Sequence, residues 1–369
     1  MNDQPVVKQE ATKFPCTACG AKLEFAPGKS ALKCSYCGAE NKIELPQEAA
    51  VEELDFYEFF ARATEQGESE EKQVVTCGSC SAKSTVDTNI SMSKCPFCGS
   101  QLTAQARASR LIKPGAILPF KVARNKAAEE FRTWLSGLWF APGELKNFAT
   151  TSGGIKGMYL PYWTYDARVT TEYQGQRGED YHETQYYDEE DDDGSTVRKS
   201  RTVTHTRWHP ASGWVENTFD DILVPAGRSL PQEVVSTLEP WDLKNLVPYA
   251  DEYMSGFQAE AYQLDLGDGF EQAKSLMEGA VRRSVERDIG GDRQQISAIR
   301  SQYDDITFKH ILLPVWISAY RYRDKTYRFI VNARTGQVQG ERPWSVAKIA
   351  MSVFAVIVVL IIIALMLKR

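Results

Sequence analysis

The sequence predicts an α+β protein of several domains: two small zinc ribbons, a larger α+β domain with antiparallel hairpins, and one C-terminal transmembrane helix. Three observations support this prediction. Eight cysteines form four Cys-x-x-Cys pairs, the middle of the chain alternates between strand-like and helix-like hydrophobic patterns, and a long apolar run lies at the C-terminal end. The 369 residues are 43% hydrophobic and 25% charged, an ordinary globular composition that excludes a wholly disordered or collagen-like chain.

The same patterns set the expected domain boundaries. A chain of this length has room for two to three domains of roughly 150 residues. We expect a first zinc ribbon at 13–45, an acidic linker with a short helix at 46–73, a second zinc ribbon at 74–104, an α+β domain at 105–343, and a transmembrane helix at 346–367.

The cysteines form an internal duplication. Each cysteine of the second ribbon lies 61 residues after its counterpart in the first, and CTACGAK and KCSYCGAEN are repeated as CGSCSAK and KCPFCGSQ. Two residues between cysteines make a tight turn that directs both thiolates at one ion, so two such turns can close a tetrahedral Zn²⁺ shell. We therefore predict two structural zinc ions, whose ligands are Cys16, Cys19, Cys34 and Cys37 in the first ribbon and Cys77, Cys80, Cys95 and Cys98 in the second.

Two other interpretations of the cysteines are open. Disulfides would need an oxidising compartment, and a redox Cys-x-x-Cys would need only one pair, surrounded by a βαβ pattern. Each ribbon has about thirty residues, which is too few for a core of its own, so a bound metal would supply the folding free energy.

Short elements are expected around the cysteines. Residues 22–25 and 84–86 alternate as ribbon strands do. In the linker, residues 51–63 can form a short helix, and the remaining acidic residues are expected to be solvated and flexible.

The middle region contains three Leu-Pro segments, Leu118-Pro119, Leu160-Pro161 and Leu313-Pro314. Because proline cannot donate a ladder hydrogen bond, we expect each segment to begin a β-rich stretch. Two helices are expected between these segments, one capped by Asn125 and one begun by a capping box of Asp268 and Glu271. A last hairpin is expected from strands at 327–332 and 337–340.

A second hairpin is expected to turn at Asp193-Gly194, a dipeptide typical of type I′ turns. That turn would place Glu189 opposite Arg198 and His182 opposite His205. Two interpretations are open: an exposed polar hairpin with an acidic tip, or a cross-strand histidine pair that holds a metal ion, although no third ligand is evident.

Residues 349–367 form an apolar run of nineteen residues without a charge. As a helix the run covers roughly 28 Å, close to the ~30 Å hydrocarbon core of a bilayer. The alternative is a buried core helix, which rarely needs to be apolar on every face. Because the N-terminal residues lack the apolar stretch of a signal peptide, we expect a tail-anchored, single-pass protein of the cell membrane with its bulk in the cytoplasm.

Taken together, the two cysteine ribbons, the segments ILPF, YLPYW, LLPVW and YRFIVNARTGQVQGE, and the terminal apolar helix resemble a bacterial family of membrane proteins with a duplicated zinc ribbon of the TFIIB type. In some bacteria these proteins are encoded beside phage-shock-type and membrane-scaffold proteins, and they are often labelled after the primosomal replication helicase. The resemblance covers nearly the whole chain. It implies a zinc-binding membrane adaptor whose partner is a protein at the bilayer, of the membrane-scaffold or phage-shock type.

Charge and motifs argue against several functional classes. Residues 1–110 carry twelve basic and fifteen acidic side chains, which makes nucleic acid an unlikely ligand by counterion release. A phosphate loop ending at Gly28-Lys29-Ser30 would need glycine where Leu23 stands, so a helicase activity is not expected. No arrangement of catalytic residues is evident, and we predict that the protein is not an enzyme. A pocket in the middle domain lined by groups with shifted pKa values would reopen that question.

We therefore predict an adaptor that recruits a protein partner to the cytoplasmic face of the membrane. A flexible linker would let each ribbon reach the partner separately. The alternative is a nucleic-acid-binding zinc-ribbon protein tethered to the membrane, since the first ribbon alone has a net charge of +2.

Overall fold

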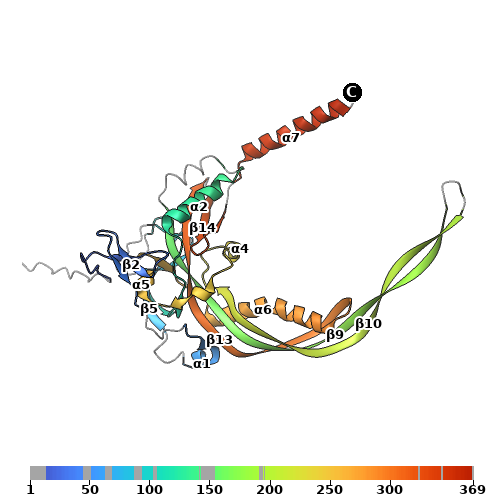
Figure 1. Ribbon diagram of the computed structural model, residues 1–369, viewed down its shortest axis with the longest axis horizontal. Coiled ribbons are helices and arrows are strands. Elements are labelled where there is room, and N and C mark those ends of the chain that lie inside the picture. The colour runs from blue at the N-terminus through green and yellow to red at the C-terminus, as the bar shows by residue number, and fades with distance from the viewer. Residues whose placement is uncertain are drawn as a thin grey trace, which may run out of the picture.

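Three very long strands dominate the fold. β9 (Lys156–Glu190) lies between β10 (Thr196–Pro225) and β13 (Arg293–Tyr322), and both neighbours run antiparallel to it. This computed structural model describes residues 14–44, 51–62, 69–86, 94–102, 106–140, 142, 154–190, 194, 196–322, 325–341 and 344–367. In Figure 1 β9 leaves the body of the molecule and forms a long curved hairpin with β10, which returns to the body.

Twelve strands of the described chain form one sheet. Its main path runs β11-β8-β13-β9-β12-β6-β5-β7, while β10 joins β9, β4 and β14 join β13, and β15 joins β14. The short strands are β4 (Leu54–Asp55), β5 (Ser69–Thr76), β6 (Lys83–Val86), β7 (Arg107–Ile112), β8 (Ala116–Ile117), β11 (Val247–Pro248), β12 (Gln258–Glu260), β14 (Lys325–Asn332) and β15 (Val338–Gly340).

The described chain contains helices as well as this sheet, so the α+β class expected from the sequence is confirmed. The helices are α1 (Phe56–Arg62), α2 (Arg124–Ser136), α4 (Gln232–Ser236), α5 (Asp251–Met254), α6 (Leu266–Ile289) and α7 (Val346–Leu367), with a 3₁₀ turn at Leu243–Asn245. A separate three-stranded sheet consists of β1 (Leu23–Phe25), β2 (Ala31–Cys34) and β3 (Glu40–Lys42).

The environment of β9 changes along its length. Residues 158–165 are buried on both faces, alternate residues are buried from 167 to 173, and nearly all residues beyond 178 are exposed. Alternation is what a strand shows when one face is packed and the other is solvated. β9 therefore begins in a core that packs against both of its faces, continues in a sheet that is covered on one face, and ends in a two-stranded ribbon that is exposed on both faces.

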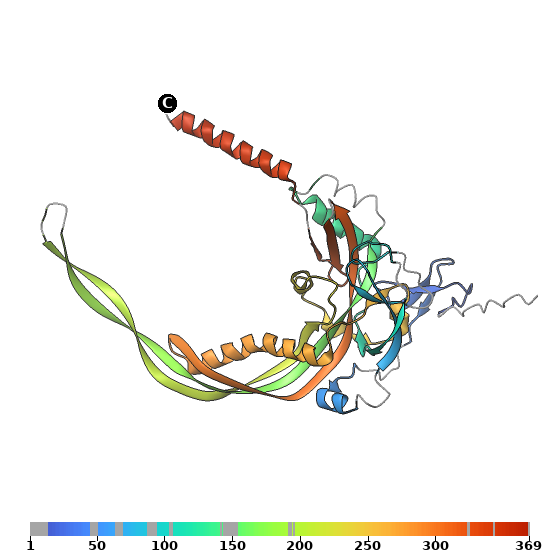
Figure 2. The same ribbon diagram turned by 180° about the vertical axis from the view of Figure 1, so that it is seen from behind.

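α6 covers the inner face of the curved sheet (Figures 1 and 2). Its buried residues recur every three or four positions from Leu266 to Ile289, which is the spacing of one helix face. A Cβ at Gly269 would overlap the Tyr165 hydroxyl, so glycine allows the close approach of α6 to β9. The predicted start of this helix at a capping box of Asp268 and Glu271 is wrong, because the helix begins earlier, after Asp265.

The Leu-Pro segments do not begin strands as predicted, because Pro161 and Pro314 lie inside β9 and β13. Each proline lies where its strand exchanges one neighbour for another. Pro161 stands between the residues that pair with β12 and those that pair with β10, and Pro314 stands between the partners of β8 and β14. Proline has no backbone N–H group, so it fits where the ladder of hydrogen bonds is interrupted. The carbonyl of Pro161 still accepts a hydrogen bond from the Ala226 N–H (2.9 Å), and that of Pro314 accepts one from the Ala333 N–H (3.1 Å).

The second cysteine ribbon belongs to the large sheet. β5 pairs with both β6 and β7, and β6 pairs with β12. The expectation of a solvated linker is therefore wrong for 69–73, which lie in β5. The short helix expected within 51–63 is present as α1, with Phe56 and Phe59 buried against Phe308. Residues 45–50 and 63–68 lie outside the described residues.

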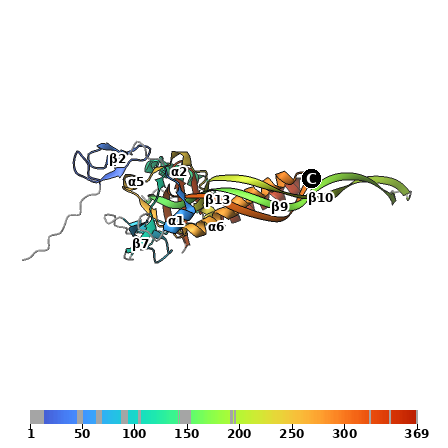
Figure 3. The same cartoon turned by 90° about the horizontal axis from the view of Figure 1, so that it is seen from below.

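The first ribbon is also packed against the body. Phe25 donates its backbone N–H to the carbonyl of Ser255 (3.0 Å), the Ser255 hydroxyl donates to the carbonyl of Leu23 (2.6 Å), and the Phe25 ring lies 5.2 Å from that of Tyr253. Figure 3 shows β2 of this ribbon and β7 on opposite sides of the body. The expectation that a flexible linker lets each ribbon reach a partner separately is therefore wrong.

Two smaller predictions have different outcomes. The helix predicted near Asn125 is present as α2, but its N-cap is Ala123, so the predicted cap is wrong. The last hairpin is confirmed: β14 and β15 pair antiparallel, and Gly336, with a φ of +81°, donates its N–H to the Asn332 carbonyl to close the turn.

The hairpin of β9 and β10 is present, but its predicted register is wrong by one residue. Glu189 faces Val197, and Arg198 faces Asp188. His182 faces Thr204, while His205 faces Tyr181. Since side chains alternate between faces, a shift of one residue places the two histidines on opposite faces. Asp193 of the predicted turn lies outside the described residues.

α7 is long and apolar enough to cross a membrane. Its window at Ala347–Leu367 has a mean hydropathy of 3.2 and is not buried against the protein. A core helix would be buried, so that alternative is contradicted. The helix projects from the body in Figure 2.

Candidate metal centres

Two clusters of four cysteines have the geometry of tetrahedral metal sites. Within each cluster the four sulfur atoms lie within 4.8 Å of one another. The shortest Sγ–Sγ distances are 3.6 Å for Cys16–Cys37, Cys19–Cys34 and Cys77–Cys98, and 3.7 Å for Cys80–Cys95. A zinc ion with Zn–S bonds of 2.3 Å would separate its ligands by roughly 3.8 Å, whereas a disulfide would join two sulfurs at roughly 2.05 Å. Both clusters are therefore compatible with a zinc ion, and none of the eight thiols is in a disulfide.

The local fold of each Cys-x-x-Cys turn explains this convergence. In all four turns the residue after the second cysteine donates its N–H to the carbonyl of the first, at 2.8–3.1 Å; these donors are Gly20, Gly38, Ser81 and Gly99. All four have positive φ values between 59° and 77°, which glycine adopts without strain. In one of these turns the Cys37 N–H also donates to the Cys34 sulfur (3.4 Å), and this bond lowers the pKa of Cys34 to about 6, which favours the thiolate that a metal needs.

The duplicated sites differ in their surroundings. Around the second site, Cys77, Cys95 and Cys98 belong to the same buried cluster as Leu160 and Leu313 of the central strands. In the first site Cys19 and Cys37 are exposed, although Cys16 and Cys34 are buried. Cys16 and Cys34 in turn belong to a buried cluster with Tyr159 and Leu312. Both sites therefore reach the core, but the first leaves two of its cysteines in solvent.

The clearest difference lies between the last two cysteines of each copy. Phe97 is fully buried, and its carbonyl accepts a bond from Arg328 Nε (3.0 Å). Tyr36 occupies the equivalent position of the first copy and is 84% exposed. One copy therefore inserts this aromatic residue into the body, and the other presents it to solvent.

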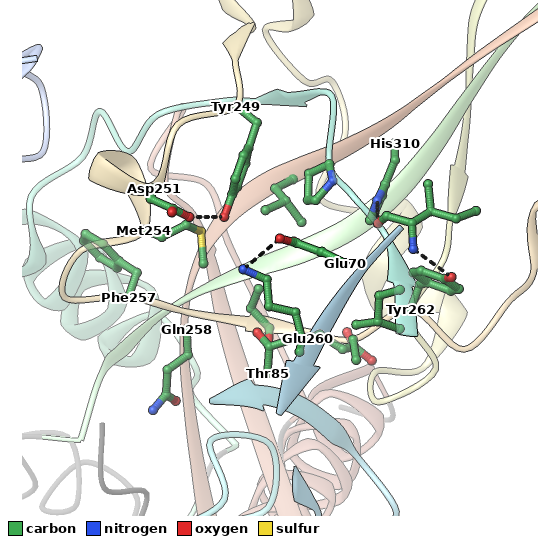
Figure 4. A pocket seen from close by; sticks show the side chains of 17 residues that line it. Glu70, Thr85, Tyr249, Asp251, Met254, Phe257, Gln258, Glu260, Tyr262 and His310 are labelled. Carbon is green, nitrogen blue, oxygen red and sulfur yellow. Dashed lines mark hydrogen bonds and ion pairs between the residues drawn. The ribbon is translucent and has the colours of Figure 1, made fainter. Parts of the chain in front are cut away.

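A small cavity of about 110 Å³ lies between the second ribbon and α5 (Figure 4). It is lined by Lys72, Asp251, Glu260, Tyr262 and His310, among others. Burial raises the pKa of Glu260, although the backbone N–H groups of Arg228 and Ser229 donate to its carboxylate. The raised pKa of Glu260 in this cavity reopens the question of an enzymatic activity. That the protein is not an enzyme stays a prediction.

His310 makes the stability of the body depend on pH. Burial lowers its pKa from 6.5 to about 4, and Nδ1 donates to the Ile112 carbonyl (2.9 Å), which leaves Nε2 unprotonated. Since the unfolded chain takes up the proton first, this residue should remove roughly 3 kcal/mol of stability as the pH falls from 6.5 to 4. We expect a smaller loss in His310→Asn, whose amide nitrogen can replace Nδ1 as the donor.

Denaturant unfolding of both proteins across this pH range measures the difference. Asp166, whose pKa burial raises to about 6, acts in the opposite direction, so only the comparison between the two proteins isolates His310. Equal pH dependence in both proteins would contradict the assignment.

A carboxylate cluster was not predicted from the sequence. Asp166, Asp220 and Asp221 converge where β10 and β13 change register. The buried Lys309 amine lies 2.7 Å from Asp221 and 2.8 Å from Glu53. Its positive charge therefore takes the place that a metal ion would have beside these carboxylates. The two irregularities place Asp221 and Asp305 at positive φ, which no pattern in the sequence indicates.

The histidines of the hairpin do not form a metal site. His182 Nδ1 lies 3.0 Å from the Thr204 hydroxyl on one face, and His205 Nε2 lies 3.4 Å from Glu183 on the other. The interpretation of these two histidines as a shared metal site is wrong.

Comparison with known proteins shows a similarity over most of the chain but no family assignment. No protein-family model matches the chain. The chain is similar to a protein of Bacillus subtilis (strain 168) described as uncharacterized protein YdjG, with 25% identity over 341 residues, which cover 91% of this chain and 92% of that protein.

Proposed function

We propose that this protein is a membrane-anchored adaptor that holds a protein partner at the cytoplasmic face through its first zinc ribbon. The observation that carries the proposal is the contrast between Tyr36 and Phe97. The body buries Phe97 of the second ribbon, and the equivalent Tyr36 stands in solvent. Exposed tyrosines on rigid supports are typical anchors of protein interfaces.

The two cysteine clusters would hold structural Zn²⁺. Four thiolates close the coordination shell, so no position is left for a substrate or an activated water. The role of the first ion would be to keep Tyr36 and its neighbours on a rigid turn.

α7 would provide the membrane anchor. Its length, mean hydropathy and exposure support a single span. Unpaired thiolates persist in reducing compartments, which favours the cytoplasm for the ribbons. With its body on that side, the protein would hold its partner next to the bilayer.

Charge favours a protein partner over nucleic acid. Lys29 on the first ribbon is paired with Glu40, and residues 1–110 carry twelve basic against fifteen acidic side chains. Nucleic-acid binding depends on several unpaired cations that can replace counterions.

Substitution of Tyr36 tests the proposal. We expect Tyr36→Ala in the full-length protein to lower the yield of one cross-linked protein in native membranes about tenfold, the loss of a typical interface anchor. Tyr57→Ala is the matched control, because Tyr57 is also exposed (64%) but lies on α1. Equal yields from Tyr36→Ala and wild type, or recovery of salt-sensitive DNA or RNA with no protein enriched, would contradict the proposal.

A further inference from the structure

The far part of the hairpin, which we call the distal arm (residues 179–190 and 196–207), has two open strand edges. β13 begins at Arg293, opposite Gly178, and so leaves the outer edge of β9 without a strand beyond that residue. β10 pairs with β9 alone in the described part of the chain. The α6 contacts of β10 lie nearer the body, for example between Ser284 and Asn217. Open edges present unpaired backbone N–H and C=O groups that can bind another strand.

The charges of the distal arm are separated by strand. Residues 179–190 contain six acidic residues and no lysine or arginine: Glu179, Asp180, Glu183, Asp188, Glu189 and Glu190. Residues 196–207 contain four basic residues and no aspartate or glutamate: Arg198, Lys199, Arg201 and Arg207. One edge of the ribbon is therefore acidic and the other is basic.

Ion pairs within the ribbon do not require this separation. Glu189 and Lys199 lie 3.2 Å apart, and Arg198 faces Asp188. Such pairs need opposite charges at opposed positions, but pairs of either polarity would serve equally well. The complete separation of acidic and basic residues between the two strands has a consequence only for another strand that pairs with one edge of the distal arm.

Geometry selects one kind of neighbour. Because β10 runs antiparallel to β9, a second copy in the same orientation places its β10 antiparallel to the open edge of β9. The acidic edge of one copy then meets the basic edge of the next. Copies related by a two-fold axis would instead pair like strands, with like charges opposed.

We propose that distal arms of neighbouring copies pair edge to edge, with β9 of one copy against β10 of the next, and extend one antiparallel sheet across several copies. An isolated two-stranded ribbon is only marginally stable in water, so the arm gains stability from each neighbour. The anchoring proposed above would give all copies in one membrane the same orientation, which this head-to-tail arrangement needs. The interface itself does not depend on the partner of the first ribbon.

An edge-swapped variant tests this arrangement in the full-length chain. It carries E179K, E183K, D188K and E189K on β9, with R198E, K199E, R201E and R207E on β10. These changes move the net charge of 179–190 from −6 to +2 and that of 196–207 from +4 to −4, while opposed positions keep opposite signs. Two differently tagged copies are co-expressed, extracted into detergent, and captured through one tag.

We expect wild type to capture wild type and the swapped variant to capture itself. Wild type should capture at least tenfold less of the swapped variant, because mixed edges bring like charges together. Self-capture by the variant is the internal control for a folded arm. Failure of wild-type copies to capture each other, loss of self-capture by the variant, or free mixing of the two proteins would each overturn the proposal.

Discussion

Replacement of Cys95 by serine should unfold the large sheet, whereas the same replacement at Cys34 should unfold only the first ribbon. The two cysteines are equivalent in the duplication and are equally buried (3% and 1% exposed). A structural zinc site contributes about 10–16 kcal/mol in zinc-finger peptides, comparable with the roughly 5–15 kcal/mol that stabilises a whole domain. Loss of either site should therefore abolish the structure that depends on it.

The two variants differ in what depends on the metal. Both cysteines pack in buried clusters that include residues of β9 and β13, but only the second ribbon contributes strands, β5 and β6, to the large sheet. The strands of the first ribbon form a sheet of their own. Hydrogen exchange of β9 and β13 should show lost protection in Cys95→Ser and retained protection in Cys34→Ser.

Elemental analysis provides the control for this experiment. Wild type should contain two zinc ions per chain, and Cys34→Ser should contain one. One zinc or none in wild type would contradict two independent sites. Equal loss of protection in both variants would contradict the different roles of the two ribbons.

Removal of residues 349–369 should transfer the protein completely from the membrane to the soluble fraction. A helix of this length and apolarity binds the bilayer in an effectively irreversible way. None of the side chains of the apolar window is buried against the body, so the deletion should leave the fold intact. Fractionation of membranes measures the transfer, and the pattern of limited proteolysis checks the fold.

A high-salt wash separates the anchor from weaker attachment. Charged surface contacts are screened at high ionic strength, whereas an inserted helix stays in the membrane. A truncated protein that still sediments with membranes in high salt would show that another part of the molecule holds the bilayer. Wild type should sediment under both conditions.

Local patterns were sufficient to predict several features. Cysteine spacing predicted which eight thiols converge, because two residues between ligands define a turn without help from the surrounding fold. The apolar window of α7 and the hairpin of β14 and β15 were likewise evident, since length, hydropathy and turn residues are local properties.

Register and domain borders could not be predicted in the same way. The register of β9 and β10 differs by one residue from the predicted one, which places His182 and His205 on opposite faces. Polar strands that are exposed on both sides specify register weakly. The sequence predicts strand starts at Pro161 and Pro314, because it does not show where one neighbouring strand replaces another; that exchange depends on long-range pairing.

By itself, the sequence determined the two cysteine sites and the apolar C-terminal helix, because both depend on residues close together in the chain. Only the tertiary structure decided that the second ribbon joins the large sheet while the first does not, and that Phe97 is buried while Tyr36 is exposed. The two copies have nearly the same local sequence, so their difference comes from the surfaces against which they pack. Those surfaces are assembled from strands more than a hundred residues away, such as β13, and no local pattern carries that information.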